Sequence, residues 1–82
     1  MKDQNPFFVT PNPVPVNASI NIQFSGVPFN PDSYYITNEN GATIRKGKII
    51  DAARNFSLSV RGMPDGTYWL IMGDRKERFT IV

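Results

Sequence analysis

The 82-residue sequence contains no cysteine and no histidine. Without cysteine, the chain can form neither a disulfide nor a thiolate metal site. Without histidine, it lacks the commonest general base and the commonest metal ligand, so a serine nucleophile has no histidine partner. A calcium loop of the D-x-D-x-D-G type and a phosphate loop of the G-x-x-x-x-G-K-S/T type are also absent. We therefore expect no enzyme, no metal site and no cofactor.

Long apolar runs and helical stripes are missing too. No segment approaches the roughly 20 apolar residues that span a bilayer. The first residues, MKDQNPFF, lack the apolar core of a secretory signal. If the domain works outside the cytoplasm, its signal peptide therefore belongs to a longer parent protein. We expect residues 1–8 to be an added start or a linker from that parent, and residues 9–82 to be a single domain.

Apolar residues recur instead at every second position. The segment SINIQFS (19–25) places Ile20, Ile22 and Phe24 on one side, which is typical of a half-buried strand. Proline and glycine turns separate several such segments, and this spacing predicts an all-β, immunoglobulin-like antiparallel β-sandwich of about seven short strands. The predicted strands are residues 7–10, 19–25, 33–37, 43–50, 56–60, 67–72 and 78–82.

The same alternation predicts the core. Gly47 is isolated within the strand 43–50, which indicates a bulge or a close backbone approach. The link at 51–55 is the only stretch that tolerates a helical turn. The predicted core residues are Phe7, Val9, Ile20, Ile22, Phe24, Tyr34, Ile36, Ile44, Phe56, Leu58, Val60, Tyr68, Leu70, Met72, Phe79 and Ile81.

Charge is uneven along the chain. Residues 1–40 carry one basic and three acidic groups, whereas residues 41–82 carry eight basic and four acidic groups. The basic half could favour an anionic partner, but a solvated face is the simpler interpretation. Arg45, Lys46 and Lys48 are too sparse a strip for nucleic acid, so we expect no nucleic-acid partner.

Two aromatic side chains fall on the side of their strands opposite the predicted core. Tyr35 alternates with Tyr34, and Trp69 alternates with Tyr68. Such a pair can stack against a sugar or pack on a protein partner. Alternatively, Trp69 covers the second face of its own sheet, and this structural role is the one we favour.

Four segments, in order, carry a family resemblance: TPNPV (10–14), NENGATIRKGKI (38–49), MPDGTYWLIM (63–72) and KERFTIV (76–82). Together they resemble the type A C-terminal sorting domain of the type IX secretion system. Met63 stands where that family usually has leucine, and Ile44 where it usually has valine.

The resemblance implies that the domain directs a larger exported protein through the periplasm to the outer membrane or cell surface. The implied partners are the type IX translocon and a sortase-like peptidase, which usually removes the domain and joins the cargo to an anionic lipopolysaccharide. Pro11, Asn12 and Pro13 would mark the start of the domain, with any cleavage at or before them. The recognition residues carried over from the motifs are Pro64, Gly66, Tyr68, Arg78, Phe79, Thr80, Ile81 and Val82.

Physical chemistry adds three expectations to this resemblance. The last strand should be open to strand addition by a partner. Gly66 should adopt a positive φ, and Tyr68 should anchor the preceding turn in the core. Two alternatives stay open: an immunoglobulin-like accessory module that binds glycan or protein through Tyr35 and Trp69, and a strand-swapped dimer.

Overall fold

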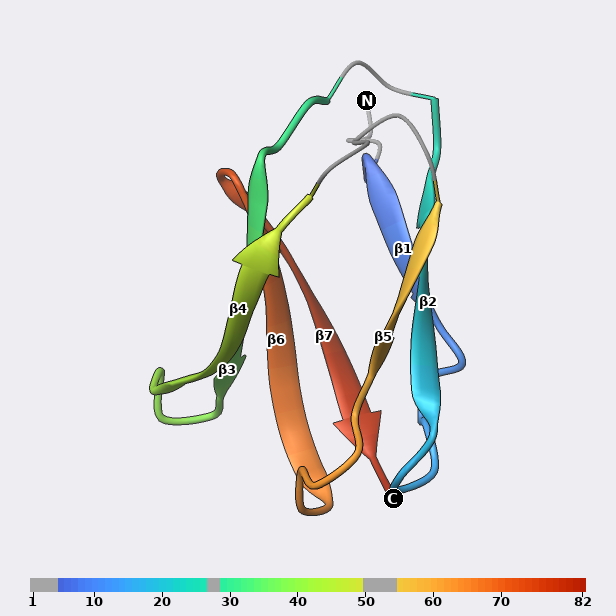
Figure 1. Cartoon of the computed structure of the whole chain (residues 1–82), viewed down its shortest axis with the longest axis vertical. Coiled ribbons are helices and arrows are strands. Elements are labelled where there is room, and N and C mark those ends of the chain that lie inside the picture. Colours follow the sequence, from blue (N-terminus) through green and yellow to red (C-terminus); the bar gives the residue numbers. More distant parts are fainter. Residues whose placement is uncertain (1–4, 27–28, 50–54) are drawn as a thin grey trace.

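A computed structural model describes residues 5–26, 29–49 and 55–82 of the chain (Figure 1). In these ranges the backbone forms strands and turns, and no helix is long and apolar enough to cross a membrane. The expected link at 51–55, apart from Asn55, lies outside the described residues. The strands are β1 (Phe7–Thr10), β2 (Ser19–Phe24), β3 (Ser33–Asn38), β4 (Thr43–Lys48), β5 (Phe56–Ser59), β6 (Gly66–Met72) and β7 (Arg75–Ile81).

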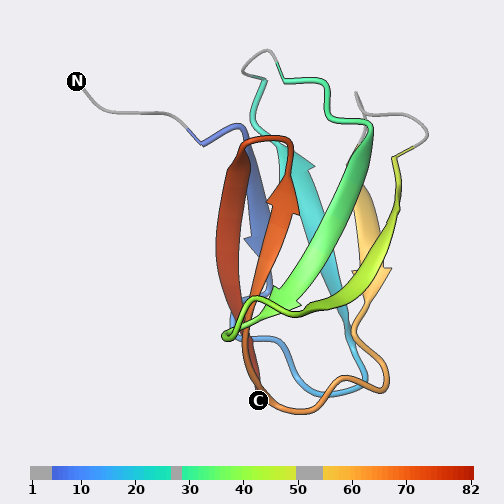
Figure 2. The same cartoon turned by 90° about the vertical axis from the view of Figure 1, so that its left-hand side faces the viewer.

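The strands form two sheets that face each other. One sheet has the order β1-β2-β5 and the other has the order β4-β3-β6-β7, with every neighbouring pair antiparallel. Figure 1 shows the two sheets edge-on, and Figure 2 shows the four-stranded sheet from its outer side. The predicted immunoglobulin-like sandwich is therefore confirmed.

The tight turn between β3 and β4 places β4 in the four-stranded sheet. The side-chain Oδ1 of Asn38 accepts hydrogen bonds from the backbone N–H of Asn40 (2.9 Å) and of Ala42 (3.0 Å). Gly41 has a φ of 86°, which suits glycine, and its N–H donates to the carbonyl of Asn38. So short a connection returns the chain beside β3 and leaves it no route to the opposite sheet.

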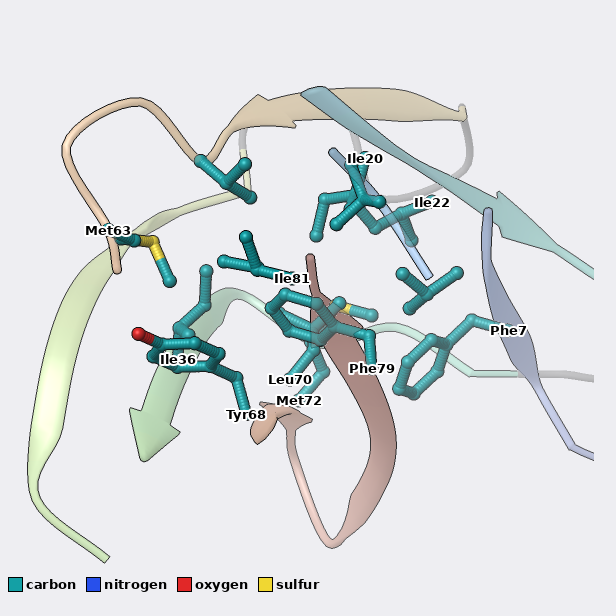
Figure 3. Close-up of a cluster of buried hydrophobic side chains, with 13 residues drawn as sticks. Phe7, Ile20, Ile22, Ile36, Met63, Tyr68, Leu70, Met72, Phe79 and Ile81 are labelled. Atoms are coloured by element: carbon teal, nitrogen blue, oxygen red, sulfur yellow. The ribbon is translucent and has the colours of Figure 1, made fainter. Parts of the chain in front are cut away.

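The inner faces of both sheets form one core (Figure 3), built largely from the predicted residues. Phe24, Tyr34, Phe56 and Leu58 are only partly buried and pack against its edge. The buried members are Phe7, Val9, Val14, Ile20, Ile22, Ile36, Val60, Met63, Tyr68, Leu70, Met72, Phe79 and Ile81.

Val14 and Met63 belong to the core although they lie in loops, where no alternation marks them. Phe7 is buried in β1 as well, two residues ahead of the position 9 at which we expected the domain to start. The folded unit extends a little further still, because the N–H of Ser25 donates to the carbonyl of Pro6.

The prediction that Ile44 lies in the core is wrong. The register between β3 and β4 shifts at Ile36 and Thr37, which pair with Arg45 and Thr43. Ile44 is the extra residue of this irregularity, and 39% of its surface is exposed. An inserted residue breaks the alternation of the strand, so counting by two from the neighbouring positions fails at Ile44.

Gly47 marks a close approach and not the bulge, which lies three residues earlier. It sits opposite Tyr34 across the β3–β4 pair. A Cβ atom at Gly47 would lie 2.6 Å from the hydroxyl oxygen of Tyr34 and 2.8 Å from two of its ring carbons. Because Gly47 has no side chain, the Tyr34 ring can lie directly over it and reach the edge of the core.

Candidate recognition surface at the last strand

The C-terminal part of strand β7 is paired on both of its edges. On one side it pairs with β6 along its whole length. On the other side Val14 forms a parallel bridge with Ile81. The N–H of Val14 donates to the carbonyl of Thr80 (2.8 Å), and the N–H of Val82 donates to the carbonyl of Val14 (2.9 Å). The N–H of Val16 donates to the carbonyl of Val82 (2.9 Å).

The side chain of Asn12 extends this pairing. Its Nδ2 donates to the carbonyl of Arg78, and its Oδ1 accepts from the N–H of Thr80, both at 3.0 Å. The amide therefore takes the place of a peptide group in a strand. Residues 11–16, which we name the proline strap, thus run beside the end of β7 (Figure 2, blue segment). The bonds Thr10–Pro11 and Asn12–Pro13 are cis.

The expectation that the last strand is open to strand addition is wrong. Its outward-facing backbone groups at Arg78, Thr80 and Val82 are already bonded to Asn12, Val14 and Val16. A partner could pair with this part of β7 only after displacing the strap. The sequence patterns did not predict this contact. The prolines within the strap argue against a strand there, and Asn12 and Arg78 lie 66 positions apart in the sequence.

The turn before β6 is held by Tyr68, as predicted. Its hydroxyl donates to the carbonyl of Pro64 at 2.7 Å, and its ring is stacked on Phe79 with centroids 5.8 Å apart. Gly66 has a φ of 148°, which confirms the predicted positive value. Figure 3 shows the Tyr68 hydroxyl pointing towards the Met63 turn. Gly66 pairs with Ile81, so this turn and the strap flank the same end of β7.

The residues predicted to be recognised fall into two groups. Tyr68, Phe79 and Ile81 are buried, so a partner does not reach them in the folded domain. The remaining residues lie at the surface, where Thr80 is half-buried and Val82 is 61% exposed. The surface group comprises Pro64, Gly66, Arg78, Thr80 and Val82, together with Pro11, Asn12 and Pro13 of the strap.

A family model of secretion system C-terminal sorting domains matches residues 9–81. The chain belongs to this family. The match confirms the resemblance drawn from the four motifs, and it identifies a type IX secretion sorting signal that directs a protein towards the cell surface. No curated protein sequence matches the chain.

The two outward aromatics of the sorting domain differ in accessibility. Tyr35 is 43% exposed, whereas Trp69 is half-buried. The ammonium nitrogen of Lys76 lies 4.6 Å from the centroid of the Trp69 ring, a cation–π contact that covers part of the indole. The ring more open to a ligand is therefore that of Tyr35.

Glu77 is the acidic side chain of β7, and it lies on the core-facing side of the strand. It lies directly opposite Leu70, which is in the core, and it is half-buried. Burial raises the pKa of the Glu77 carboxyl above its ordinary value, because the charged form loses hydration. Across the described ranges, no group of three or more acidic side chains is arranged to hold a metal ion.

Proposed function

We propose that the chain is the non-catalytic sorting signal of a larger exported protein, and that the export machinery reads β7 and the proline strap as one surface. The observation that carries this proposal is the pair of hydrogen bonds between the Asn12 amide and the backbone of Arg78 and Thr80. They join the first and the last of the family-like motifs into a single structural unit. The partner we propose is the type IX translocon in the outer membrane.

Recognition of this surface works through side chains and not through an added strand. Since the strap occupies the edge of β7, a partner meets the outward side chains of Arg78, Thr80 and Val82 beside the exposed prolines Pro11 and Pro13. Buried residues contribute indirectly. Phe79 and Ile81 anchor the strand in the core, and Tyr68 fixes the turn next to it. In this proposal the buried group positions the surface that the partner contacts.

Processing by a sortase-like peptidase fits best at a bond ahead of β1. Phe7 and Val9 are core residues, so cleavage between Thr10 and Pro11 would separate them from the rest of the domain. Losing two buried apolar side chains would cost several kcal/mol, on the order of the whole stability of a small domain. We therefore propose that the peptidase cleaves a bond before Phe7. The cargo, which has crossed the periplasm, is then joined to an anionic lipopolysaccharide at the cell surface.

An export assay with matched variants tests the proposed recognition surface. A reporter fused ahead of residues 1–82 is expressed in a bacterium that has a type IX system, and the reporter at the cell surface is compared with the reporter kept in the periplasm. We expect Asn12→Ala, and deletion of Thr80–Val82, to reduce export strongly. Asn21→Ala changes an exposed asparagine on the outer side of β2 and should leave export unchanged.

Loss of stability is a separate cause of failure and needs its own control. Asn55→Ala removes the hydrogen bond that the Asn55 Oδ1 accepts from the N–H of Phe24 (2.9 Å), in the three-stranded sheet and away from β7, so it provides a folded variant destabilised by a comparable amount, about 0.5–1.5 kcal/mol. If Asn55→Ala reduces export as much as Asn12→Ala does, export follows stability and not the strap. Normal export of the folded Asn12→Ala variant would refute the composite surface.

A further inference from the structure

The outer face of the four-stranded sheet has an ordered arrangement of cations and rings. Cross-strand pairing places Lys46, Tyr35, Ile71 and Lys76 in one row across the sheet. Residues directly opposite one another point to the same side. This row therefore has an apolar centre on β3 and β6 with a lysine at each edge strand, roughly 14 Å apart at three strand spacings.

Each of the neighbouring rows has a cation at one edge only. Trp69 lies between Thr37 on β3 and Arg78 on β7. Lys48 lies opposite Ser33 at the end of the sheet. In Figure 2 these rows cross the sheet from β7 (red) at the left to β4 (yellow-green) at the right. We name the outer face of these strands the basic face, with Tyr35, Trp69, Lys46, Lys48, Lys76 and Arg78 as its defining residues.

The charged side chains that the four strands place on the basic face are all basic, and the nearby Asp32, just before β3, has its carboxylate 3.4 Å from the Ser33 hydroxyl. The strands β3, β4, β6 and β7 contain a single acidic residue, Glu77, and it faces the core side of the sheet. No carboxylate of these strands therefore neutralises the cations on their outer side. The cation–π contact orders Lys76 over the indole of Trp69, which holds one positive charge near the middle of the face.

A shallow hollow lies at the β3–β4 end of this face. It has a volume of about 350 Å³ and is lined by Ser33, Tyr35, Lys46, Gly47 and Lys48. The backbone of Gly47 forms its floor between the two lysines. The hollow thus combines a hydroxyl group, an aromatic ring and two ammonium groups, which are respectively a hydrogen-bond partner, a stacking surface and charge partners.

We propose that the basic face binds an acidic polysaccharide, with a carboxylated sugar residue seated in the hollow against Tyr35. The cations at both edges match negative groups repeated along an extended chain. An acidic protein segment fits less well, because protein partners rely on side chains buried in enclosed pockets, whereas this hollow is shallow and lies on an open sheet face. The proposal is independent of recognition by the translocon, since the hollow lies on β3 and β4.

The experiment compares three polymers with the 82-residue protein. Calorimetric titration at about physiological ionic strength, where the screening length is about 8 Å, measures affinity for polygalacturonate, for neutral dextran and for poly-L-glutamate. We expect binding to polygalacturonate, no binding to dextran and clearly weaker binding to poly-L-glutamate. Failure to bind polygalacturonate, or equal affinity for poly-L-glutamate at matched charge, overturns the proposal.

Variants separate the hollow from general positive charge. Lys46→Gln should weaken polygalacturonate binding roughly two- to fivefold, the range of an exposed ion pair, whereas Arg61→Gln removes the same charge from a distant turn and should change it little. Tyr35→Phe should retain the affinity and Tyr35→Ala should lower it. If Arg61→Gln weakens binding as much as Lys46→Gln, or if Tyr35→Ala has no effect, the face is a nonspecific polyanion binder and the proposal fails.

Discussion

The outer side of the three-stranded sheet carries hydroxyl and amide groups with one ring, that of Phe8, and no charge, whereas the outer side of the four-stranded sheet carries cations beside its rings. No charged residue occurs in β1, β2 or β5. The exposed residues of those strands are Phe8, Thr10, Ser19, Asn21, Gln23, Ser57 and Ser59. Four basic side chains and two aromatic ones define the basic face on the other sheet.

The inner sides of the same two sheets are alike, since both contribute fully buried aliphatic and aromatic residues to one core. Folding therefore makes the same demand on each sheet, namely apolar residues at alternate inner positions. It makes no demand for cations on one outer side and neutral groups on the other. The difference between the outer sides therefore indicates that the four-stranded sheet carries surface chemistry that packing does not require.

Core substitutions should affect the two sheets equally and give the largest effects. Ile22 on β2 and Leu70 on β6 are both completely buried. Truncation of either to alanine removes apolar contacts and leaves a cavity, so we expect each to lower the free energy of unfolding by about 2–5 kcal/mol. Urea denaturation of Ile22→Ala and Leu70→Ala measures this. A cost below about 1 kcal/mol for only one of them would show that the sheets do not share one core.

Gly47→Ala should destabilise the four-stranded sheet by an intermediate amount. The new methyl group would meet the Tyr34 ring and hydroxyl, so the ring must move from its place at the core edge. We expect a cost of about 1–3 kcal/mol, typical of an inserted methyl group in a packed site. The double variant Gly47→Ala with Tyr34→Ala is the control. If removing the ring does not reduce the cost of the methyl group, the Tyr34 contact is not its cause.

Asn12→Ala tests the connection of the strap to β7. Both hydrogen bonds of the amide lie near solvent, and water can replace them in part. The expected loss is therefore about 0.5–1.5 kcal/mol. Hydrogen exchange should locate it, because the N–H of Thr80 should exchange faster while amides of β3 remain protected. Unchanged protection of Thr80 would mean that the Asn12 side chain does not hold the strand.

Glu77→Gln should give the smallest effect, and one that depends on pH. Because burial raises its pKa in the folded state, the folded protein holds this proton more tightly than the unfolded chain does. The stability that Glu77 contributes is thus present at low pH and is lost as pH rises through the raised pKa. We expect Glu77→Gln to raise the melting temperature slightly at pH 7, with the difference shrinking as pH falls.

Lys46→Gln is the matched control for that titration, since it changes one charge on the outer side. It should change the free energy of unfolding by less than about 0.5 kcal/mol at every pH of the titration. A difference between Glu77→Gln and the parent that stays constant across pH would contradict an inward, desolvated carboxyl.

Much of the fold follows from local patterns. Alternation in β2 and β6 predicted which residues face the core, and the turns at Asn38–Gly41 and Pro64–Gly66 lie where their glycines indicated. Prediction failed where alternation breaks or is absent. Ile44 sits in a register irregularity, and Val14 and Met63 are buried from loops. Such positions depend on what the rest of the molecule places beside them.

The candidate site divides in the same way. The strands, the two turns, the positive φ of Gly66 and the family could all be predicted from the sequence, because each depends on residues close together along the chain. The contact between the strap and the edge of β7, and the gathering of cations on one outer face, became visible only in the folded protein. Those contacts join segments far apart in sequence, and their partners are chosen by packing of the whole sandwich and not by any local preference.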